Sequence, residues 1–169
     1  MIINKIKSIL FILVMLILQT SLNACDAVIS TEGEKMSKDV VILSKIINFP
    51  VQPEEAWWQE VEMGSSGRLE IGPKDRVFVA VMKFKKNDMD SIVKRSKIAS
   101  DDTVRLDKSI VFTWYPNELK KLMKPLPDGS SYIKGAVFEP TLFIMNSSYT
   151  SGYMLKISED KIFLSLGTM

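Results

Sequence analysis

The run Val77-Phe78-Val79-Ala80-Val81-Met82 constrains the fold of this chain more than any other segment. It is rich in β-branched and aromatic residues, which are enriched in strands. Because successive side chains of a strand point to opposite faces, a strand that is apolar at every position must be covered on both sides. The segment from Arg76 to Phe84 is therefore predicted to be a central strand with packed layers on both faces.

The rest of the sequence adds helices and further strands around this one. Asp88 is suited to capping a helix that continues through Ile98, and Pro116 opens a second short helix through Met123. The gaps between the C-terminal strands are short, as in hairpins. The predicted class is α+β, a mainly antiparallel sheet with about two helices packed on it, after a cleaved signal peptide. The other predicted strands are Val40–Phe49, Ser109–Trp114, Tyr132–Phe138, Thr141–Met145, Gly152–Ile157 and Ile162–Leu166.

The N-terminus has the three-part layout of a secretory signal peptide. Lys5 and Lys7 precede an unbroken apolar run from Ile9 to Leu18, and a polar step follows at residues 19–21. As a helix, the apolar run is about 15 Å long at 1.5 Å per residue. The hydrocarbon core of a bilayer is about 30 Å thick. A cleaved signal peptide is therefore favoured over the alternative, a permanent membrane span.

The tetrapeptide Leu22-Asn23-Ala24-Cys25 follows the polar step. An aliphatic residue, two small residues and an invariant cysteine make up a lipobox, so residues 1–25 resemble the precursors of bacterial lipoproteins. Asn23 departs from the pattern, in which a smaller residue is usual. The resemblance implies cleavage before Cys25, diacylglycerol on its sulfur and usually a third acyl chain on the new amine. It implies nothing about the fold that follows.

Two or three acyl chains hold a protein stably on a bilayer, whereas one chain binds it only marginally. The resemblance therefore implies a domain outside the cytoplasm, lipid-anchored in the cell envelope, on the periplasmic side in a Gram-negative cell. The alternative is an ordinary signal peptide with a free Cys25, but that cleavage requires a small residue where Leu22 stands. We expect a signal peptide at 1–24, a lipidated tether at 25–39 and a single α+β domain at 40–169.

Composition narrows the chemistry of the domain. The 22 basic and 20 acidic residues include Lys5 and Lys7, so cleavage leaves 20 of each sign. A near-neutral domain has no electrostatic reason to bind nucleic acid. The chain has no histidine and one cysteine, which removes the commonest general base, the commonest metal ligand and any intrachain disulfide. No metal or cofactor is expected.

Two motif-like patterns are interpreted as chance. Gly67-x4-Gly72-Pro73-Lys74 is similar to a phosphate-binding loop, but Pro73 lacks a backbone donor that the phosphate would need. It is interpreted as a turn before the central strand. The Ser-x-x-Lys spacings at Ser91–Lys94 and Ser131–Lys134 occur as often as random placement gives, and the companion Lys-Thr-Gly motif is missing.

The aromatic pairs Trp57-Trp58 and Trp114-Tyr115 are the most suggestive candidates for contact with a ligand or a partner. Large aromatic side chains are enriched at binding hot spots, and they are also ordinary core anchors. Because neighbours in a strand point to opposite faces, one member of each pair is expected to be exposed.

Three functions are consistent with these observations. The favoured one is a non-enzymatic binding or accessory protein of the envelope, of the immunity type for example, with the membrane and a protein as its partners. The second is a hydrolase of cell-wall or surface polymer, which needs two converging carboxyl groups and a raised pKa. Adjacent acids such as Glu54-Glu55 and Asp101-Asp102 do not establish that geometry. The third is a small-ligand-binding lipoprotein, which needs an enclosed apolar cavity of several hundred Å³.

Overall fold

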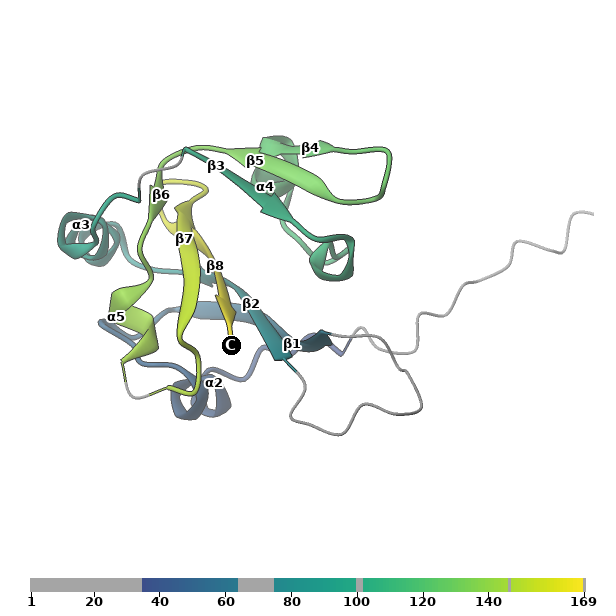
Figure 1. Ribbon diagram of the computed structural model, residues 1–169. Coiled ribbons are helices and arrows are strands. Elements are labelled where there is room, and N and C mark those ends of the chain that lie inside the picture. The colour runs from purple at the N-terminus through teal and green to yellow at the C-terminus, as the bar shows by residue number, and fades with distance from the viewer. Residues whose placement is uncertain (1–34, 64–74, 100–101, 146, 169) are drawn as a thin grey trace, which may run out of the picture. The chain divides into compact units, whose positions relative to one another are not determined.

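A five-stranded antiparallel sheet forms the middle of the domain in the computed structural model, which describes residues 35–63, 75–99, 102–145 and 147–168. The strand order is β1-β2-β8-β7-β6, so β2, β8 and β7 are internal and β1 and β6 lie at the edges (Figure 1). All neighbouring strands are antiparallel. The strands are β1 (Glu55–Met63), β2 (Asp75–Lys83), β6 (Val137–Phe138), β7 (Ser151–Lys156) and β8 (Lys161–Gly167).

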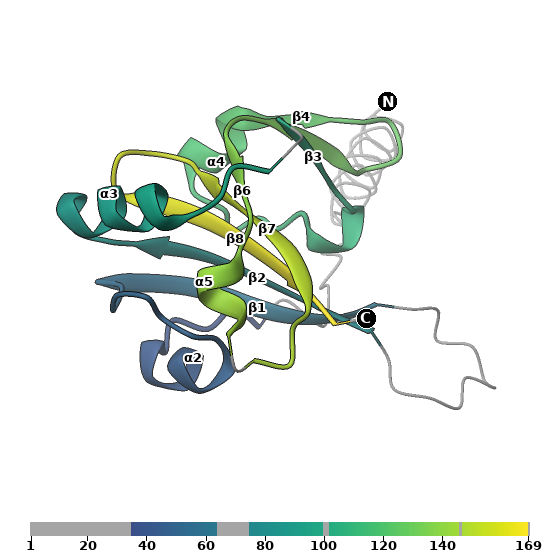
Figure 2. The ribbon, with the colours of Figure 1, turned by 60° about the vertical axis from the view of Figure 1, so that its left-hand side comes forward.

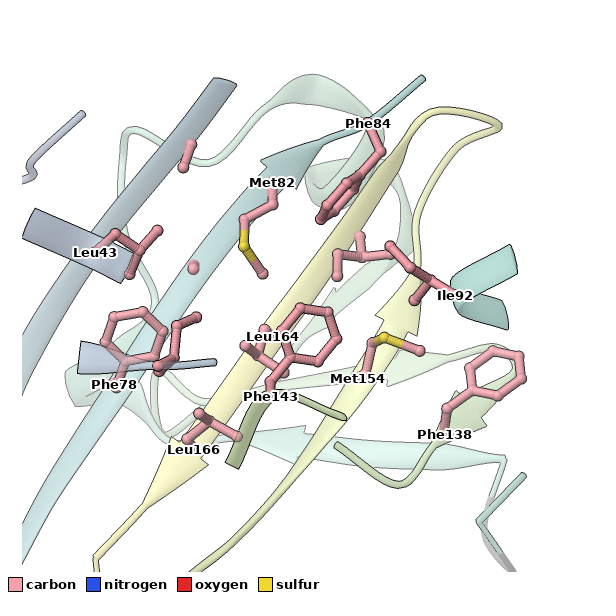
Figure 3. Close-up of a cluster of buried hydrophobic side chains, with 14 of the residues drawn as sticks. Leu43, Phe78, Met82, Phe84, Ile92, Phe138, Phe143, Met154, Leu164 and Leu166 are labelled. Carbon is pink, nitrogen blue, oxygen red and sulfur yellow. The ribbon is translucent and has the colours of Figure 1, made fainter. Parts of the chain in front are cut away.

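Three short helices cover one face of this sheet: α2 (Val40–Ile46), α3 (Lys86–Arg95) and α5 (Thr141–Ile144). Their arrangement along one side of the sheet is visible in Figure 2. Figure 3 shows the apolar side chains that meet between these helices and the sheet, which we call the helical-face core. Its buried members are Leu43, Ile47, Ala56, Phe78, Ala80, Met82, Phe84, Met89, Ile92, Phe138, Phe143, Tyr149, Met154, Ile162, Leu164 and Leu166.

A second, three-stranded antiparallel sheet covers the opposite face, in the order β3-β5-β4. It packs there together with a single 3₁₀ turn and helix α4, and the buried residues between the layers are called the sheet-face core. The elements are β3 (Thr103–Leu106), η1 (Lys108–Ile110), α4 (Asn117–Leu122), β4 (Met123–Pro125) and β5 (Ser131–Lys134). The sheet-face core comprises Val79, Val81, Leu106, Ile110, Phe112, Tyr115, Leu119, Ile133, Val137, Leu155, Ile157 and Phe163.

Strand β2 confirms the prediction of a central strand that is covered on both sides. Phe78 and Met82 point into the helical-face core, Val79 and Val81 point into the sheet-face core, and all four are fully buried. The predicted α+β class, with a mainly antiparallel sheet, is confirmed as well.

Helix α2 corrects the prediction of a strand at Val40–Phe49. The Asp39 side chain accepts a hydrogen bond of 2.9 Å from the backbone N–H of Ile42 and so caps the helix. The helix buries Leu43 against the sheet, and Ile47, which ends it, is buried too. The β-branched residues favoured a strand, but capping and the packing of one face outweigh that weak preference.

Three other predicted strands differ from the structure. Thr141–Met145 contains the single turn α5 after Pro140, with Phe143 buried. Ser109–Trp114 contains the end of η1 and a loop, because the Asp107 carboxylate accepts from the Ser109 N–H at 2.9 Å and closes a turn there. Tyr132–Phe138 is divided at Gly135 into β5 and β6, which belong to different sheets. The strands β1, β3 and β4 were not predicted, and Met123, which was expected in the second helix, is the first residue of β4.

Gly152 on β7 lies opposite Leu166 on β8. Its φ of 146° is a conformation that L side chains rarely adopt. A Cβ atom at this position would lie 2.1 Å from the backbone oxygen of Ser165. Only glycine therefore allows this part of the β7–β8 ladder to form.

Candidate functional site at the edge of the central sheet

Strand β1 separates the first aromatic pair onto the two faces of the central sheet. Trp58 is half-buried against the helical-face core, 6.0 Å from Phe78 between ring centroids, and its Nε1 donates to the Asp39 carbonyl at 3.1 Å. Trp57 is half-buried against the sheet-face core. Both tryptophans find a packing surface because layers cover both faces, so neither is fully exposed.

The second aromatic pair lies in the loop between η1 and α4 and packs as one unit. Tyr115 is buried, donates a hydrogen bond from its hydroxyl to the Ile110 carbonyl and meets Phe163 edge-on at 5.5 Å. Trp114 is half-buried and contacts Tyr115 edge-on at 4.7 Å, while its Nε1 donates to the Gln59 side-chain oxygen at 3.1 Å. Trp114 and Tyr115 therefore act as anchors of the loop in the sheet-face core.

A shallow pocket of about 160 Å³ opens beside Trp57. It lies where the start of β1 meets the chain just before and at the start of α2. Known small-molecule pockets have volumes of roughly 300–1,000 Å³, so this one has room for a single side chain. Its lining residues are Lys38, Val40, Glu54, Glu55, Ala56 and Trp57, and we call it the Trp57 pocket.

The strand register places a row of charges next to the Trp57 pocket. Glu55 on β1 is opposite Lys83 on β2, and Lys83 is opposite Lys161 on β8. The Lys83 Nζ atom lies 3.3 Å from Glu55 Oε1 and 4.0 Å from Glu54 Oε2. The row continues to α4, where the Lys161 Nζ lies 2.6 Å from Glu118 Oε1. Each carboxylate of this row therefore faces an ammonium group that is held in place by the sheet.

The electrostatics of this region favour fixed charges over proton transfer. The hydrogen bond between Lys161 and Glu118 raises the pKa of the lysine and lowers the pKa of the glutamate. Burial raises the pKa of the Tyr149 hydroxyl, and Glu60, which accepts its hydrogen bond at 2.8 Å, raises it further. Every described aspartate or glutamate whose pKa departs from its ordinary value has a lowered pKa. These groups stay ionised, or protonated in the case of the tyrosine, at neutral pH.

The two motif-like patterns of the sequence do not form a second candidate site in the described residues. The phosphate-loop-like segment, like Cys25 and the predicted signal peptide, lies outside the described residues. Ser131 is buried whereas Lys134 is exposed and lies 3.5 Å from Asp102, so this Ser-x-x-Lys pair does not converge. Ser91 and Lys94 are both exposed on α3. Within the described ranges, no group of three or more acidic, cysteine or histidine side chains could hold a metal ion.

The structure brings together residues that the sequence did not single out. Lys38, Lys83, Lys161 and Glu118 come from four separate parts of the chain and surround the pocket or complete the adjacent row of charges. Strand register places Lys83 next to Lys161, whereas Lys38 precedes α2 and Glu118 lies on α4. β1, which carries Glu55 of this row, was not predicted. Of the four aromatic candidates, Trp57 alone lines the pocket.

No family model, curated protein or solved structure matches this chain. In the part of the chain that the structure describes, no helix is both long and apolar enough to cross a membrane.

Proposed function

We propose that this protein is a lipid-anchored binding protein of the bacterial cell envelope, which uses the Trp57 pocket to hold a side chain of a protein partner. Cys25 and its lipobox support the anchor. The Trp57 pocket supports the binding role, because it combines an aromatic wall with two carboxylates, which outnumber the one ammonium group of Lys38, in a space for one side chain. This pocket is the single observation that carries the proposal.

The chemistry of the pocket favours an arginine or lysine of the partner. A cation is attracted to the face of a tryptophan ring, and a guanidinium group also forms strong charge-assisted hydrogen bonds to carboxylates. Glu54 is held only loosely by Lys83, at 4.0 Å, so its carboxylate remains available to a second cation. The half-buried Trp57 supplies a rigid contact with little loss of conformational entropy.

The two other functions receive less support from the described residues. A hydrolase needs a carboxyl group whose pKa is raised, and the described acids with a shifted pKa are all shifted downward. An apolar-ligand carrier needs a larger and less charged cavity than the Trp57 pocket.

The anchor is tested by growing cells with a clickable fatty acid. The wild-type chain should be labelled and the Cys25→Ser variant should not. Equal labelling of both chains, or labelling of neither, would contradict lipidation of Cys25.

The binding role is tested by photocrosslinking in intact cells. A photoreactive amino acid replaces Lys38 at the pocket or, as the control, the exposed Lys94 on α3. We expect a discrete protein adduct from position 38 and none from position 94. The double change Glu54→Lys and Glu55→Lys should reduce the adduct about tenfold, which corresponds to about 1.4 kcal/mol of binding free energy. An adduct that survives these changes would refute the role of the pocket.

A further inference from the structure

Helix α2 presents two neighbouring apolar side chains to solvent. It buries Leu43 against the central sheet, yet 67% of Val41 and 46% of Ile42 are exposed. The other large apolar residues that are exposed in the described part of the chain are Ile98, Tyr132 and Met145, and none of them is adjacent to another. The pair on α2 is therefore an apolar contact surface that the domain itself does not cover.

Lysines surround this apolar pair. Lys35 and Lys38 precede the helix, Lys45 lies in its last turn, and all three are exposed. The single acid between residues 35 and 49 is Asp39, whose side chain caps the helix. Apolar side chains flanked by lysines fit the interface of a bilayer that contains anionic lipids, where the lysines contact headgroups.

The length of chain between Cys25 and α2 indicates what the apolar pair on α2 contacts. Cys25 lies 12 positions before Ser37, which is bonded to Trp58 of β1 just before α2 begins. Even a fully extended chain of 12 residues spans at most about 40–43 Å. A lipid on Cys25 would therefore keep α2 close to one bilayer, and the contact of α2 with that bilayer becomes an intramolecular step at high effective concentration. No such proximity favours a second copy of the chain or a soluble protein.

We infer that α2 lies against the bilayer that holds the Cys25 lipid, with Val41 and Ile42 among the headgroups and Lys35 and Lys45 against anionic lipid. This inference rests on the proposed lipid anchor. The acyl chains supply the attachment, and α2 sets the orientation of the domain. The small sheet β3-β5-β4 packs on the other side of the central sheet from α2 (Figure 2), so it faces away from the membrane.

The test uses the full lipidated chain in vesicles of phosphatidylcholine and phosphatidylglycerol that carry a headgroup quencher. An environment-sensitive fluorophore is attached to Val41→Cys or, as the control, to Lys124→Cys on β4, since acylation blocks Cys25. We expect quenching at position 41 to exceed quenching at position 124 about threefold. Adding Ile42→Glu should abolish this difference, whereas Ser91→Glu on α3 should preserve it.

The outcomes separate the two proposals. A chain that carries no lipid and does not float with the vesicles overturns both the anchor and the inference. An anchored chain with equal quenching at positions 41 and 124 overturns the inference alone. Matching far-UV circular dichroism of the labelled variants verifies that each of them is folded.

Discussion

The two faces of the central sheet are covered by layers that are held in place by different interactions. On the helical face, the buried side chains are apolar apart from the tyrosine hydroxyl of Tyr149, which reaches Glu60. The buried polar residues of the described chain, in contrast, lie on the side of the small sheet: Gln59, Ser130, Ser131 and Ser165. Helices satisfy their own backbone groups, so an apolar stripe is enough to attach them.

The layer on the sheet face contains an irregular segment whose backbone needs other partners. The Tyr115 hydroxyl meets the Ile110 carbonyl, the Asp107 carboxylate meets the Ser109 N–H, and Trp114 is fixed by Gln59. Buried polar groups are costly unless they are paired, so the buried Tyr115 bond and the partly buried Trp114 bond restrict the arrangement of the loop. The Asp107 bond is exposed and closes the turn. The helical face therefore depends on apolar area, whereas the opposite face depends on specific hydrogen bonds as well.

The largest expected effect tests whether the two layers form one cooperative unit. Phe78→Ala on the helical face and Phe163→Ala on the sheet face each remove a fully buried ring that contacts two aromatic neighbours. Each change should lower the free energy of unfolding by about 3–5 kcal/mol. Urea unfolding should remain a single transition by tryptophan fluorescence and by far-UV circular dichroism. Separate transitions in Phe163→Ala would show that the small-sheet layer unfolds alone.

Two tyrosines of the sheet face should respond in different ways when each is replaced by phenylalanine, and both changes in the free energy of unfolding should be smaller than those above. The Tyr153 hydroxyl is buried without a hydrogen bond of acceptable geometry in the described part of the chain, although its cross-strand neighbour Ser165 carries a hydroxyl. Tyr153→Phe should therefore leave the stability unchanged or raise it, whereas Tyr115→Phe should cost about 1 kcal/mol. Thermal melts of the two variants measure the difference. A large loss in Tyr153→Phe would mean that this hydroxyl has a partner.

The smallest effect is a difference in acid sensitivity between the faces. Hydrogen bonds from Ser130 lower the pKa of Asp128, and the backbone N–H of Ser109 lowers that of Asp107. A carboxylate with a folded-state pKa below its unfolded value stabilises the fold above the unfolded value, and this stability is lost as the pH falls through the folded pKa. As the pH drops below about 4, the protection of backbone amides against hydrogen exchange should therefore fall in β3 and β5 before it falls in α3. Equal loss in both layers would contradict this order.

The sequence predicted the parts of this fold that local pattern determines. β2, β7 and β8 lie where strands were predicted, and α4 begins directly after Pro116. Helix α3 was predicted less well, because it begins at Lys86 with Lys85 rather than Asp88 at its N-cap position and ends at Arg95 before Ile98. The error at Val40–Phe49 arose because β-branched residues favour strands in general, whereas this segment is capped by Asp39 and packs one side on the sheet.

The candidate site was predicted only in part. Trp57 stood out as a large aromatic, but the charges beside it come from residues far apart in the chain. Lys83 and Lys161 become neighbours of Glu55 only through the register of three strands. Register depends on long-range pairing, which no local pattern in this sequence specifies.

The attachment of Ser37 to β1 has a mechanical consequence. Ser37 and Trp58 exchange two backbone hydrogen bonds, of 2.8 and 2.9 Å, at the open edge of the central sheet. A pull on the N-terminal segment therefore loads these two bonds before it reaches the nine-residue ladder between β1 and β2. Because two bonds resist less than the nine-residue pairing of β1 with β2, we expect the Ser37–Trp58 bonds to break first under tension.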